Sequence, residues 1–245
     1  NTWSVTKSFI STLVGQCIDM NFIENEYIML NEIFYENSNT SQVSIKNLLT
    51  MSSGWADDWL FLFRPNFLNR MLEKPLENSP GTTFLYNNAA CHLNSYVIHT
   101  TTGLTPKQFA MEHLFPDLGI DNPNWNSDWE NINNGSYDLR LTLREMVKLG
   151  QLYLQKGKSG QEQILSSSWI EKATSGQINE GTSESYGYLW WLTGPGYLAL
   201  GAGGQFIVVI PDLQLIIGTQ SSLGSNIYVG ILLDIIYSHI VPILI

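Results

Sequence analysis

The sequence predicts an α+β fold, in which an antiparallel sheet flanked by helices is joined to a mostly helical lobe. Residues 9–18 carry a wide apolar stripe at helical period. Between about residue 19 and residue 175, further helical stretches alternate with polar loops. From Tyr186 onward the period becomes that of strands, and an apolar segment closes the chain. We therefore expect a single domain over residues 1–245, with the helical lobe at about 19–175 and the sheet plus a C-terminal helix at about 186–245.

The composition indicates a globular protein and excludes one class of partner. Hydrophobic residues make up 44% of the 245 positions and charged residues only 14%, so the chain can bury a full core. Lysines and arginines number 12 against 22 aspartates and glutamates, which gives a net charge of -10 without a basic stripe. We therefore expect no nucleic acid partner. Cys17 and Cys91 fall on helices that should be buried, and we interpret them as small core residues rather than a disulfide.

The two ends of the chain raise separate questions. Residues 226–245 are strongly apolar, but Asp234, Ser238, His239 and Pro242 interrupt them. No uncharged run of about 18 residues remains, so we expect a helix covering the sheet and no transmembrane segment. No signal peptide stands at residue 1, and the chain opens almost on the serine described below. This position predicts that an N-terminal part is missing.

Capping signals define the expected helices of the lobe. Serine or threonine precedes most of the starts, and glycine follows several of the ends. The expected helices are residues 45–51 after Ser44, 88–102 before Gly103, 106–115 after Thr105, 143–155 behind the capping box of Thr142 and Glu145, and a short helix through Ala173 behind Ser167 or Ser168. Residues 117–138 should form a long ordered loop. The aromatic run 55–67, which contains Asp57 and Asp58, is compatible with a packed lid and equally with a satellite core.

Short runs of strand character follow one another in the last third of the chain. The expected strands are residues 187–192, 197–200, 205–210 and 215–220, with turns at 193–196 and 211–212. Their hairpin spacing predicts an antiparallel meander at the centre of the sheet. The C-terminal helix should then cover one of its faces.

The first candidate for chemistry is a serine and a lysine at the head of the first helix. Ser4 and Lys7 stand three residues apart, so their side chains share a helix face within hydrogen-bonding reach. A lysine at the head of a buried helix is costly to desolvate, which favours a lowered pKa or a fixed polar partner. The alternative is that Ser4 caps the helix and Lys7 is solvated. No other lysine in the chain has a serine three positions before it.

Two further segments could complete such a site. Tyr86 and Asn88 follow a proline-glycine turn and open a helix, from which a phenol and an amide could point into a cleft. The same Y-x-N pattern also occurs at Tyr35, so it is weak by itself. The glycine-rich run 201–205 directly precedes a strand and could present uncovered backbone N–H groups. Its structural alternative is a β-bulge without a ligand.

These pieces, in this order, resemble the serine β-lactamase and penicillin-binding-protein superfamily. The likeness is greatest to its class C-like branch of esterases, D-aminopeptidases and 6-aminohexanoate-dimer-hydrolase-like amidases. It extends to three further segments and covers nearly the whole chain. They are residues 48–54, similar to an L-L-T-x-x-S-G landmark, residues 80–88, similar to P-G-x-x-F-x-Y-x-N, and residues 186–191, similar to a Y-G-Y-G-W strand. The resemblance implies a β-lactamase/transpeptidase-like fold and a metal-free serine hydrolase.

The resemblance also implies a role for each matching residue. Ser4 would be the acylated nucleophile, and Lys7 would help to deprotonate it. Tyr86 would act as shared general base and acid, with Lys7 close by to favour its ionised form. Asn88 would hold the substrate, and the backbone N–H groups of Ser4 and Gln205 would form the oxyanion hole. Acylation would release an alcohol or amine, and water would then release the acid.

One departure from the family pattern bears on the substrate. The branch that destroys β-lactams usually carries K-T-G in the third motif, where this chain has Ala202, Gly203 and Gly204. These three residues would line the substrate site, but no lysine is there to bind a substrate carboxylate. We therefore expect an ester or small-amide substrate and poor β-lactamase activity. The alternatives are a penicillin-binding D-Ala-D-Ala carboxypeptidase or weak class C-like β-lactamase, and a non-catalytic ligand-binding module.

Other motifs and partners are not indicated. Residues 157–159 mimic the end of a phosphate loop, but Leu152 stands where its first glycine belongs. No G-x-S-x-G elbow is present, and the four histidines, at positions 92, 99, 113 and 239, lack metal-ligand spacing. We expect no cofactor and no metal. The family resemblance suggests a periplasmic or extracellular protein, while the oligomeric state is left open.

Overall fold

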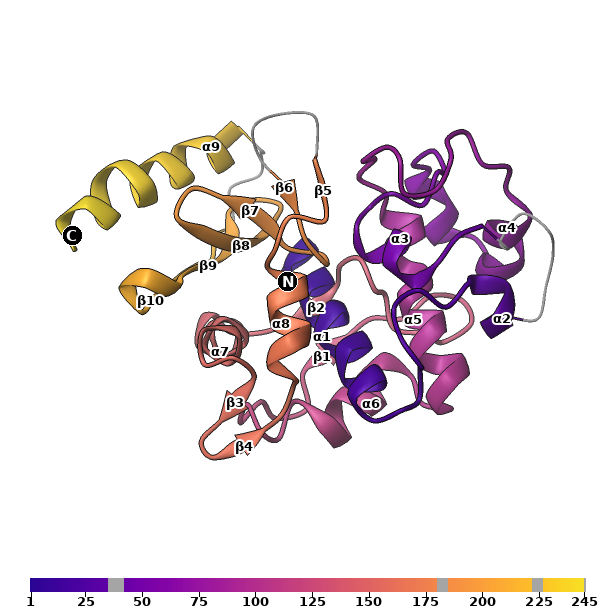
Figure 1. The fold of residues 1–245 in the computed structure, drawn as a ribbon, viewed down its shortest axis with the longest axis horizontal. Helices are drawn as coiled ribbons and strands as arrows, with labels where there is room; N and C mark the ends of the chain where they lie inside the picture. Colours follow the sequence, from indigo (N-terminus) through magenta and orange to yellow (C-terminus); the bar gives the residue numbers. More distant parts are fainter. Residues whose placement is uncertain (35–41, 180–184, 222–226, 245) are drawn as a thin grey trace.

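A computed structural model describes residues 1–34, 42–179, 185–221 and 227–244, and within them an antiparallel sheet is the central layer (Figure 1). The strand order is β10-β9-β8-β7-β6-β5, so each strand pairs with its neighbour in sequence. The strands are β5 (Ile178–Asn179), β6 (Ser185–Tyr186), β7 (Trp191–Thr193), β8 (Gly196–Gly201), β9 (Gln205–Ile210) and β10 (Leu215–Thr219). The predicted meander is confirmed, with β5 and β6 added at one edge.

Helices surround this sheet and build the lobe beside it. The α-helices are α1 (Thr6–Asp19), α2 (Leu30–Phe34), α3 (Ile45–Leu49), α4 (Phe67–Glu73), α5 (Asn88–Thr102), α6 (Pro106–His113), α7 (Leu143–Leu154), α8 (Ser167–Ala173) and α9 (Ile227–Asp234). The 3-10 turns are η1 (Trp3–Val5), η2 (Trp59–Phe63), η3 (Pro211–Leu213) and η5 (Val241–Ile243), and η4 (Ile235–Ile240) is π-helical. The capping boxes at Ser44, Thr105 and Thr142 form, and Gly103 ends α5 in the left-handed conformation.

Both faces of the sheet are covered, because the side chains of β9 pack into a separate hydrophobic cluster on each face. Ile207 and Val209 point into the main core, where Gly150 of α7 packs against Ile207. Phe206 and Val208 point to the opposite face and join a second cluster with Ile236 of the C-terminal segment. All six residues of β9 are buried, because alternate side chains of a strand serve opposite faces. The expected cover of one face by the C-terminal segment is confirmed, and Figure 1 shows α9 in yellow beside the sheet.

The first helix runs through the core between the sheet and the lobe. Every residue of α1 from Thr6 to Cys17 is buried, and the helix packs against α5, α6 and β8. Cys17 and Cys91 are both buried and unpaired, as predicted. Among the described helices, none is long and apolar enough to cross a membrane.

The structure corrects two local predictions. The predicted strand 187–192 is interrupted: residues 187–190 form a turn between β6 and β7. Leu189 has a φ of +59° and donates its N–H to Leu49 O, so the backbone turns away to pack on α3. The second correction concerns α8, whose N-cap is Ser166, one residue before the serines predicted, because its hydroxyl accepts the N–H of Trp169.

Two short ribbons begin within segments that the sequence predicts to be a loop and a turn. β1 (Asn124–Trp125) pairs with β2 (Leu139–Arg140), so residues 126–138 form a closed loop at the end of that ribbon. β3 (Lys158–Ser159) pairs with β4 (Glu162–Gln163) across the predicted glycine turn. The 126–138 loop is tied to the N-terminal residues, since Thr2 donates its N–H to Leu139 O. This contact brings the loop to the head of α1.

Candidate active site

The head of the first helix places Ser4 and Lys7 in direct contact. Ser4 lies on η1 and is half-buried, and Lys7 follows on the first turn of α1 with only 1% of its surface exposed. The Lys7 ammonium donates a hydrogen bond of 2.9 Å to Ser4 Oγ. The predicted serine and lysine pair is therefore present as a hydrogen bond, on a continuous stretch of 3-10 and α-helix.

Two further acceptors complete the surroundings of the lysine. Lys7 Nζ lies 2.9 Å from Asn88 Oδ1 and 2.8 Å from the backbone oxygen of Ser136. An ammonium group has three hydrogens to donate and cannot accept. Each of the three hydrogens has an acceptor, which offsets the cost of burying the charge. The arrangement suits a charged Lys7 with a fixed orientation toward Ser4.

The first turn of α5 fixes Asn88 on this lysine. The side chain of Asn87 caps the helix by accepting the N–H of Ala90, and its amide donates to Trp55 O. The Asp57 carboxylate accepts the N–H of Asn88 at 3.0 Å. Burial raises the pKa of Asp57, while the Asn88 N–H and the nearby Lys7 charge oppose the shift. The carboxylate thus helps to hold the start of α5.

Tyr86 lies beside the lysine through its ring. The ammonium of Lys7 is 4.9 Å from the ring centroid of Tyr86, and the half-buried phenol stacks on Trp191 with centroids 5.9 Å apart and an interplanar angle of 18°. Among the described residues, no hydrogen bond joins the Tyr86 hydroxyl to Ser4 or Lys7. Tyr86 is thus adjacent to Lys7 through its ring face and not through its hydroxyl.

The glycine-rich turn between β8 and β9 packs against the backbone at the start of η1. A Cβ on Gly201 would lie 2.4 Å from Thr2 O, so only glycine allows this approach. Gly203 O accepts a hydrogen bond from the Ser221 hydroxyl, and Gly204 O accepts one of 2.8 Å from Thr219. These bonds tie the turn to the end of β10.

The other residues predicted on this turn lie nearby. Gln205 is 2% exposed, and its side-chain amide donates to Ser221 O at 2.5 Å. Ala202 and Gly203 are half-buried at the tip of the turn, and Gly204 is buried. The turn thus contacts η1, but no hydrogen bond among the described residues joins it to the Ser4 side chain.

A pocket of about 330 Å³ opens beside Ser4. Its walls come from four separate parts of the chain. The lining residues are Trp3 and Ser4 of η1, Leu62 and Phe63 of η2, Asn88 of α5, and Tyr137 of the 126–138 loop. Four of them are apolar or aromatic, and none of the six carries a formal charge. The pocket therefore suits a neutral, apolar group next to the serine.

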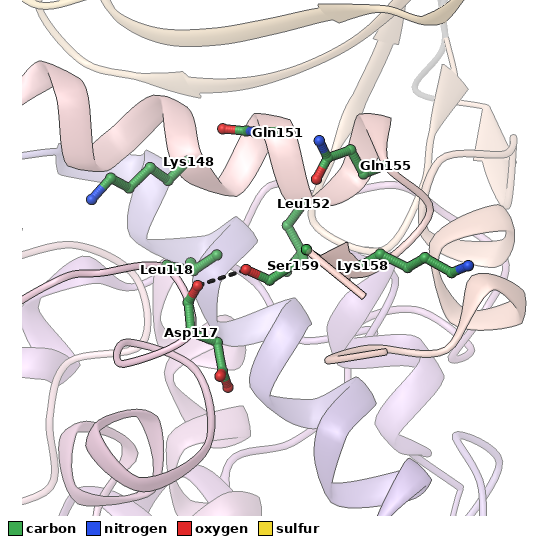
Figure 2. A pocket seen from close by; sticks show the side chains of 9 residues that line it. Asp117, Leu118, Lys148, Gln151, Leu152, Gln155, Lys158 and Ser159 are labelled. Atoms are coloured by element: carbon green, nitrogen blue, oxygen red, sulfur yellow. Dashed lines mark hydrogen bonds between the residues drawn. The ribbon is translucent and has the colours of Figure 1, made fainter. Parts of the chain in front are cut away.

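A second pocket, of about 320 Å³, lies at α7 and the β3–β4 ribbon (Figure 2). Lys148 and Lys158 both line it, but Figure 2 shows their side chains pointing in opposite directions. Lys148 donates to Gly119 O, and Ser159 donates to Asp117 O. Lys158 and Ser159 form a strand rather than opening a helix, so residues 157–159 lack the structure of a phosphate loop.

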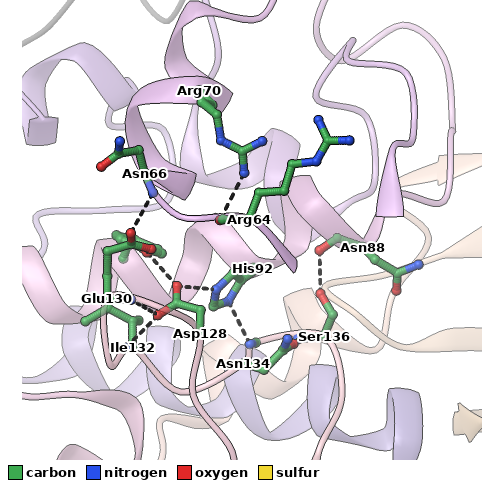
Figure 3. A network of polar contacts seen from close by, with 12 residues as sticks. Arg64, Asn66, Arg70, Asn88, His92, Asp128, Glu130, Ile132, Asn134 and Ser136 are labelled. Carbon is green, nitrogen blue, oxygen red and sulfur yellow. Dashed lines mark hydrogen bonds and ion pairs between the residues drawn. The ribbon is translucent and has the colours of Figure 1, made fainter. Parts of the chain in front are cut away.

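The sequence reasoning missed the contribution of the 126–138 loop. Ser136 accepts the Lys7 hydrogen bond through its carbonyl, and its hydroxyl donates to Asn88 O at 2.5 Å (Figure 3). These contacts join residues more than 40 positions apart in the sequence. The loop also lacks a periodic pattern from which the contacts could have been predicted. The apolar pocket residues Trp3, Phe63 and Tyr137 were likewise not predicted as a group.

The histidines do not form a metal site in the part of the chain that is described. No group of three or more histidine, cysteine, aspartate or glutamate side chains in the described ranges could hold a metal ion. His92 is fully buried.

Comparisons with known proteins agree with this architecture. The model of the β-lactamase family matches residues 1–227. The fold and the match over most of the chain define a member of the serine β-lactamase and penicillin-binding-protein-like superfamily. The chain belongs to the β-lactamase family. A search of curated protein sequences gives no match.

Several solved structures have the same fold as this chain, and their descriptions name different kinds of protein. A candidate 6-aminohexanoate-dimer hydrolase from Bacillus anthracis has a TM-score of 0.78 at 22% identity, over 96% of this chain and 72% of that one. A penicillin-binding protein from Bacillus halodurans has a TM-score of 0.72 at 17% identity, over 94% and 85%. A family VIII carboxylesterase has a TM-score of 0.73 at 16% identity, over 91% and 78%. At these identities the likeness establishes the fold, and hydrolases are among the neighbours.

Proposed function

We propose that the protein is a serine hydrolase that forms an acyl-enzyme on Ser4 and cleaves an ester or a small amide. The observation that carries the proposal is the hydrogen bond from the buried Lys7 ammonium to Ser4 Oγ, held in place by Asn88 and Ser136. A serine beside a fixed cation is a recognisable arrangement for nucleophilic catalysis. The names of the structural neighbours, which include a carboxylesterase and an aminohexanoate-dimer hydrolase, agree with this class.

The proposed reaction runs through one covalent intermediate. Ser4 Oγ attacks the substrate carbonyl carbon while Tyr86, acting as a phenolate, takes the hydroxyl proton and becomes a phenol. The Lys7 ammonium stabilises the negative charge on the serine oxygen and lies close to the phenol ring. Tyr86 then gives the proton to the leaving alcohol or amine, and the bond to that group breaks. Water attacks the acyl-enzyme in the same way, and the acid leaves as Ser4 regains its proton.

The backbone N–H groups of Ser4 and Gln205 are the proposed oxyanion donors. Support comes from the packing of the β8–β9 turn on η1, which brings the two backbones together. Asn88 would bind the substrate while keeping Lys7 in place. Ala202, Gly203 and Gly204 would contact the substrate through their backbone, since none of them offers a polar side chain.

The pocket beside Ser4 defines the proposed substrate class further. Its walls are Trp3, Leu62, Phe63 and Tyr137, so we expect a neutral acyl group such as hexanoyl or phenylacetyl. No lysine stands at residues 202–204 to attract a carboxylate. We therefore expect poor turnover of the β-lactam nitrocefin.

The test is the mass of the intact protein after incubation with a fluorophosphonate and, separately, with a penicillin. We expect a fluorophosphonate adduct that is absent from the Ser4→Ala variant. Folded protein that gains no adduct would refute the acyl-enzyme and favour a ligand-binding module on the same fold. A lasting penicillin adduct would favour the second candidate, a penicillin-binding carboxypeptidase or weak β-lactamase, for which the Bacillus halodurans neighbour is the supporting observation.

A further inference from the structure

A buried histidine and aspartate stand behind the loop that holds the lysine. His92 Nε2 lies 3.0 Å from Asp128 Oδ2, and both side chains are almost completely buried. On its other side, His92 Nδ1 accepts the backbone N–H of Gly135 at 3.0 Å. Figure 3 shows the imidazole between Asp128 and the 134–136 segment. The ring thus joins α5 to the loop directly before Ser136.

The hydrogen bonds fix the protonation of this ring. Because the Gly135 N–H points at Nδ1, that nitrogen carries no hydrogen. The single ring hydrogen is then on Nε2, where the Asp128 carboxylate accepts it. His92 is therefore a neutral imidazole held in one tautomer, and its contact with Asp128 is a hydrogen bond to a carboxylate rather than an ion pair.

The carboxylate is itself held by four donors. Asp128 Oδ1 accepts the backbone N–H groups of Glu130 and Ile132, and Oδ2 accepts the hydroxyl of Tyr96 in addition to His92. Burial raises the pKa of Asp128, but the hydrogen bonds from His92 and Tyr96 outweigh it and hold the pKa below its ordinary value. Asp128 stays ionised at neutral pH and keeps the tautomer of His92 fixed.

The loop backbone at Gly135 lies directly against α5, next to this histidine. A Cβ on Gly135 would lie 2.6 Å from Ser95 Oγ and 3.2 Å from His92 Cα, so only glycine fits. The next residue, Ser136, gives its carbonyl to Lys7 at 2.8 Å and its hydroxyl to Asn88 O. The position of the Ser136 carbonyl therefore depends on how Gly135 is held.

We propose that His92 and Asp128 are positioning residues that place the Ser136 carbonyl on Lys7 through the Gly135 N–H. This inference rests on the proposed serine hydrolase function. His92 touches no reacting atom. Its role is to keep one of the three acceptors of Lys7 in place, so that the ammonium stays directed at Ser4. A misplacement of about 1 Å in such a support can cost on the order of 100-fold in rate.

Two amide substitutions of His92 test its hydrogen bond with Gly135 separately from its hydrogen bond with Asp128. In His92→Asn the amide oxygen lies close to the position of Nδ1 and can still accept the Gly135 N–H. In His92→Gln the longer amide can reach Asp128 but leaves Gly135 without its acceptor. Both variants lose one buried hydrogen bond, so their stabilities should fall by similar amounts. Only His92→Gln should release the loop that holds Lys7.

A third variant changes the tautomer of His92. It also removes the Asp128 oxygen that accepts the Tyr96 hydroxyl, which keeps Glu130 Oε2 as an acceptor at 3.2 Å. In Asp128→Asn the side-chain oxygen must stay with the two backbone donors at Glu130 and Ile132, so the new NH2 group faces His92 Nε2. The imidazole must then accept at Nε2 and carry its hydrogen on Nδ1, where it meets the Gly135 N–H. Two donors would face each other at the 3.0 Å contact. Replacing the aspartate beside a catalytic histidine by asparagine has this tautomer effect in serine proteases.

The experiment measures the second-order rate of fluorophosphonate labelling of Ser4 together with the urea midpoint of each variant. We expect His92→Gln and Asp128→Asn to label at least about tenfold more slowly than the unchanged protein, and His92→Asn to label within about threefold of it. His99→Gln, on the same helix and away from the site, is the matched control and should label normally.

Nitrogen chemical shifts of the His92 ring supply a second readout. We expect the Nε2–H tautomer in the unchanged protein and its loss in Asp128→Asn. Equal labelling rates for His92→Gln and His92→Asn, or rates that follow the urea midpoints alone, would overturn the positioning role. If the unchanged protein is not labelled at all, the proposed serine hydrolase function fails and this inference fails with it.

Discussion

Gly15 offers a sharp test of how α1, the helix that carries Lys7, is packed. It lies in the buried part of α1, where a Cβ would stand 2.6 to 2.7 Å from three atoms of the Trp169 indole. The Trp169 side chain is 3% exposed and packs on Tyr188 with ring centroids 5.2 Å apart. The indole therefore has little space to move away from an added methyl group.

Two opposing effects determine the stability of Gly15→Ala. In a helix interior, alanine is more favourable than glycine by about 1 kcal/mol. Overpacking a close-packed core, in contrast, costs about 1–3 kcal/mol. Because three ring atoms are approached, we expect the upper part of that range and a net loss of about 1–2 kcal/mol. For a protein of this size, such a loss lowers the melting temperature by about 2–8 °C.

A matched glycine makes the comparison clean. Gly230 lies at an exposed position of α9, and a Cβ there would meet no atom within 4 Å. Gly230→Ala should therefore leave the melting temperature unchanged or raise it. Thermal and urea unfolding of both variants supply the measurement. The packing argument would be refuted if Gly15→Ala stabilised the protein as Gly230→Ala does, or if Gly15→Ala remained destabilising in a Trp169→Leu background.

Three further predictions concern the site and its supports. Asn88→Ala removes an acceptor of Lys7 and should slow fluorophosphonate labelling of Ser4 by about 100-fold, and a rate within twofold of normal would contradict its proposed role in orienting Lys7. Gly201→Ala puts a Cβ 2.4 Å from Thr2 O and should also slow labelling, while labelling at the normal rate would show that the β8–β9 turn does not support the nucleophile. Burial raises the pKa of Glu26, but the hydrogen bond and charge of Lys172 hold it below its ordinary value of 4.5, so stability should fall as the pH drops below about 4.5. Urea midpoints from pH 3 to 7 should be less pH-dependent in Glu26→Gln, and an unchanged profile would refute the linkage.

Local rules predicted much of the fold because each signal lies within a few neighbouring residues. The caps at Ser44, Thr105 and Thr142 satisfy N–H groups three positions away, so sequence alone fixes those helix starts. The serine and lysine of the site are likewise one helical turn apart. Helix geometry brings the two side chains within reach of each other, and the contacts of Lys7 with Asn88 and Ser136 then orient the ammonium toward Ser4.

The sequence was less informative where a long-range contact overrides local preference. Residues 187–190 have strand-forming composition, yet Leu189 donates its N–H to Leu49 O and the backbone turns. For α8, several serines were possible caps, and Ser166 was fixed by its N–H bond to Asp19 together with the turn that follows. Such choices depend on partners more than 100 residues away.

Helical period, caps and motif spacing are properties of neighbouring residues, so they were enough to predict the class of fold and the position of the candidate nucleophile. The surroundings of Lys7 and the lining of the pocket depend on how the whole chain folds. Ser136 reaches Lys7 through its backbone carbonyl, which every residue type possesses, so no residue identity could reveal it. The wall of Phe63 and Tyr137 exists because η2 and the 126–138 loop meet beside Ser4, and their separation in sequence conceals that meeting.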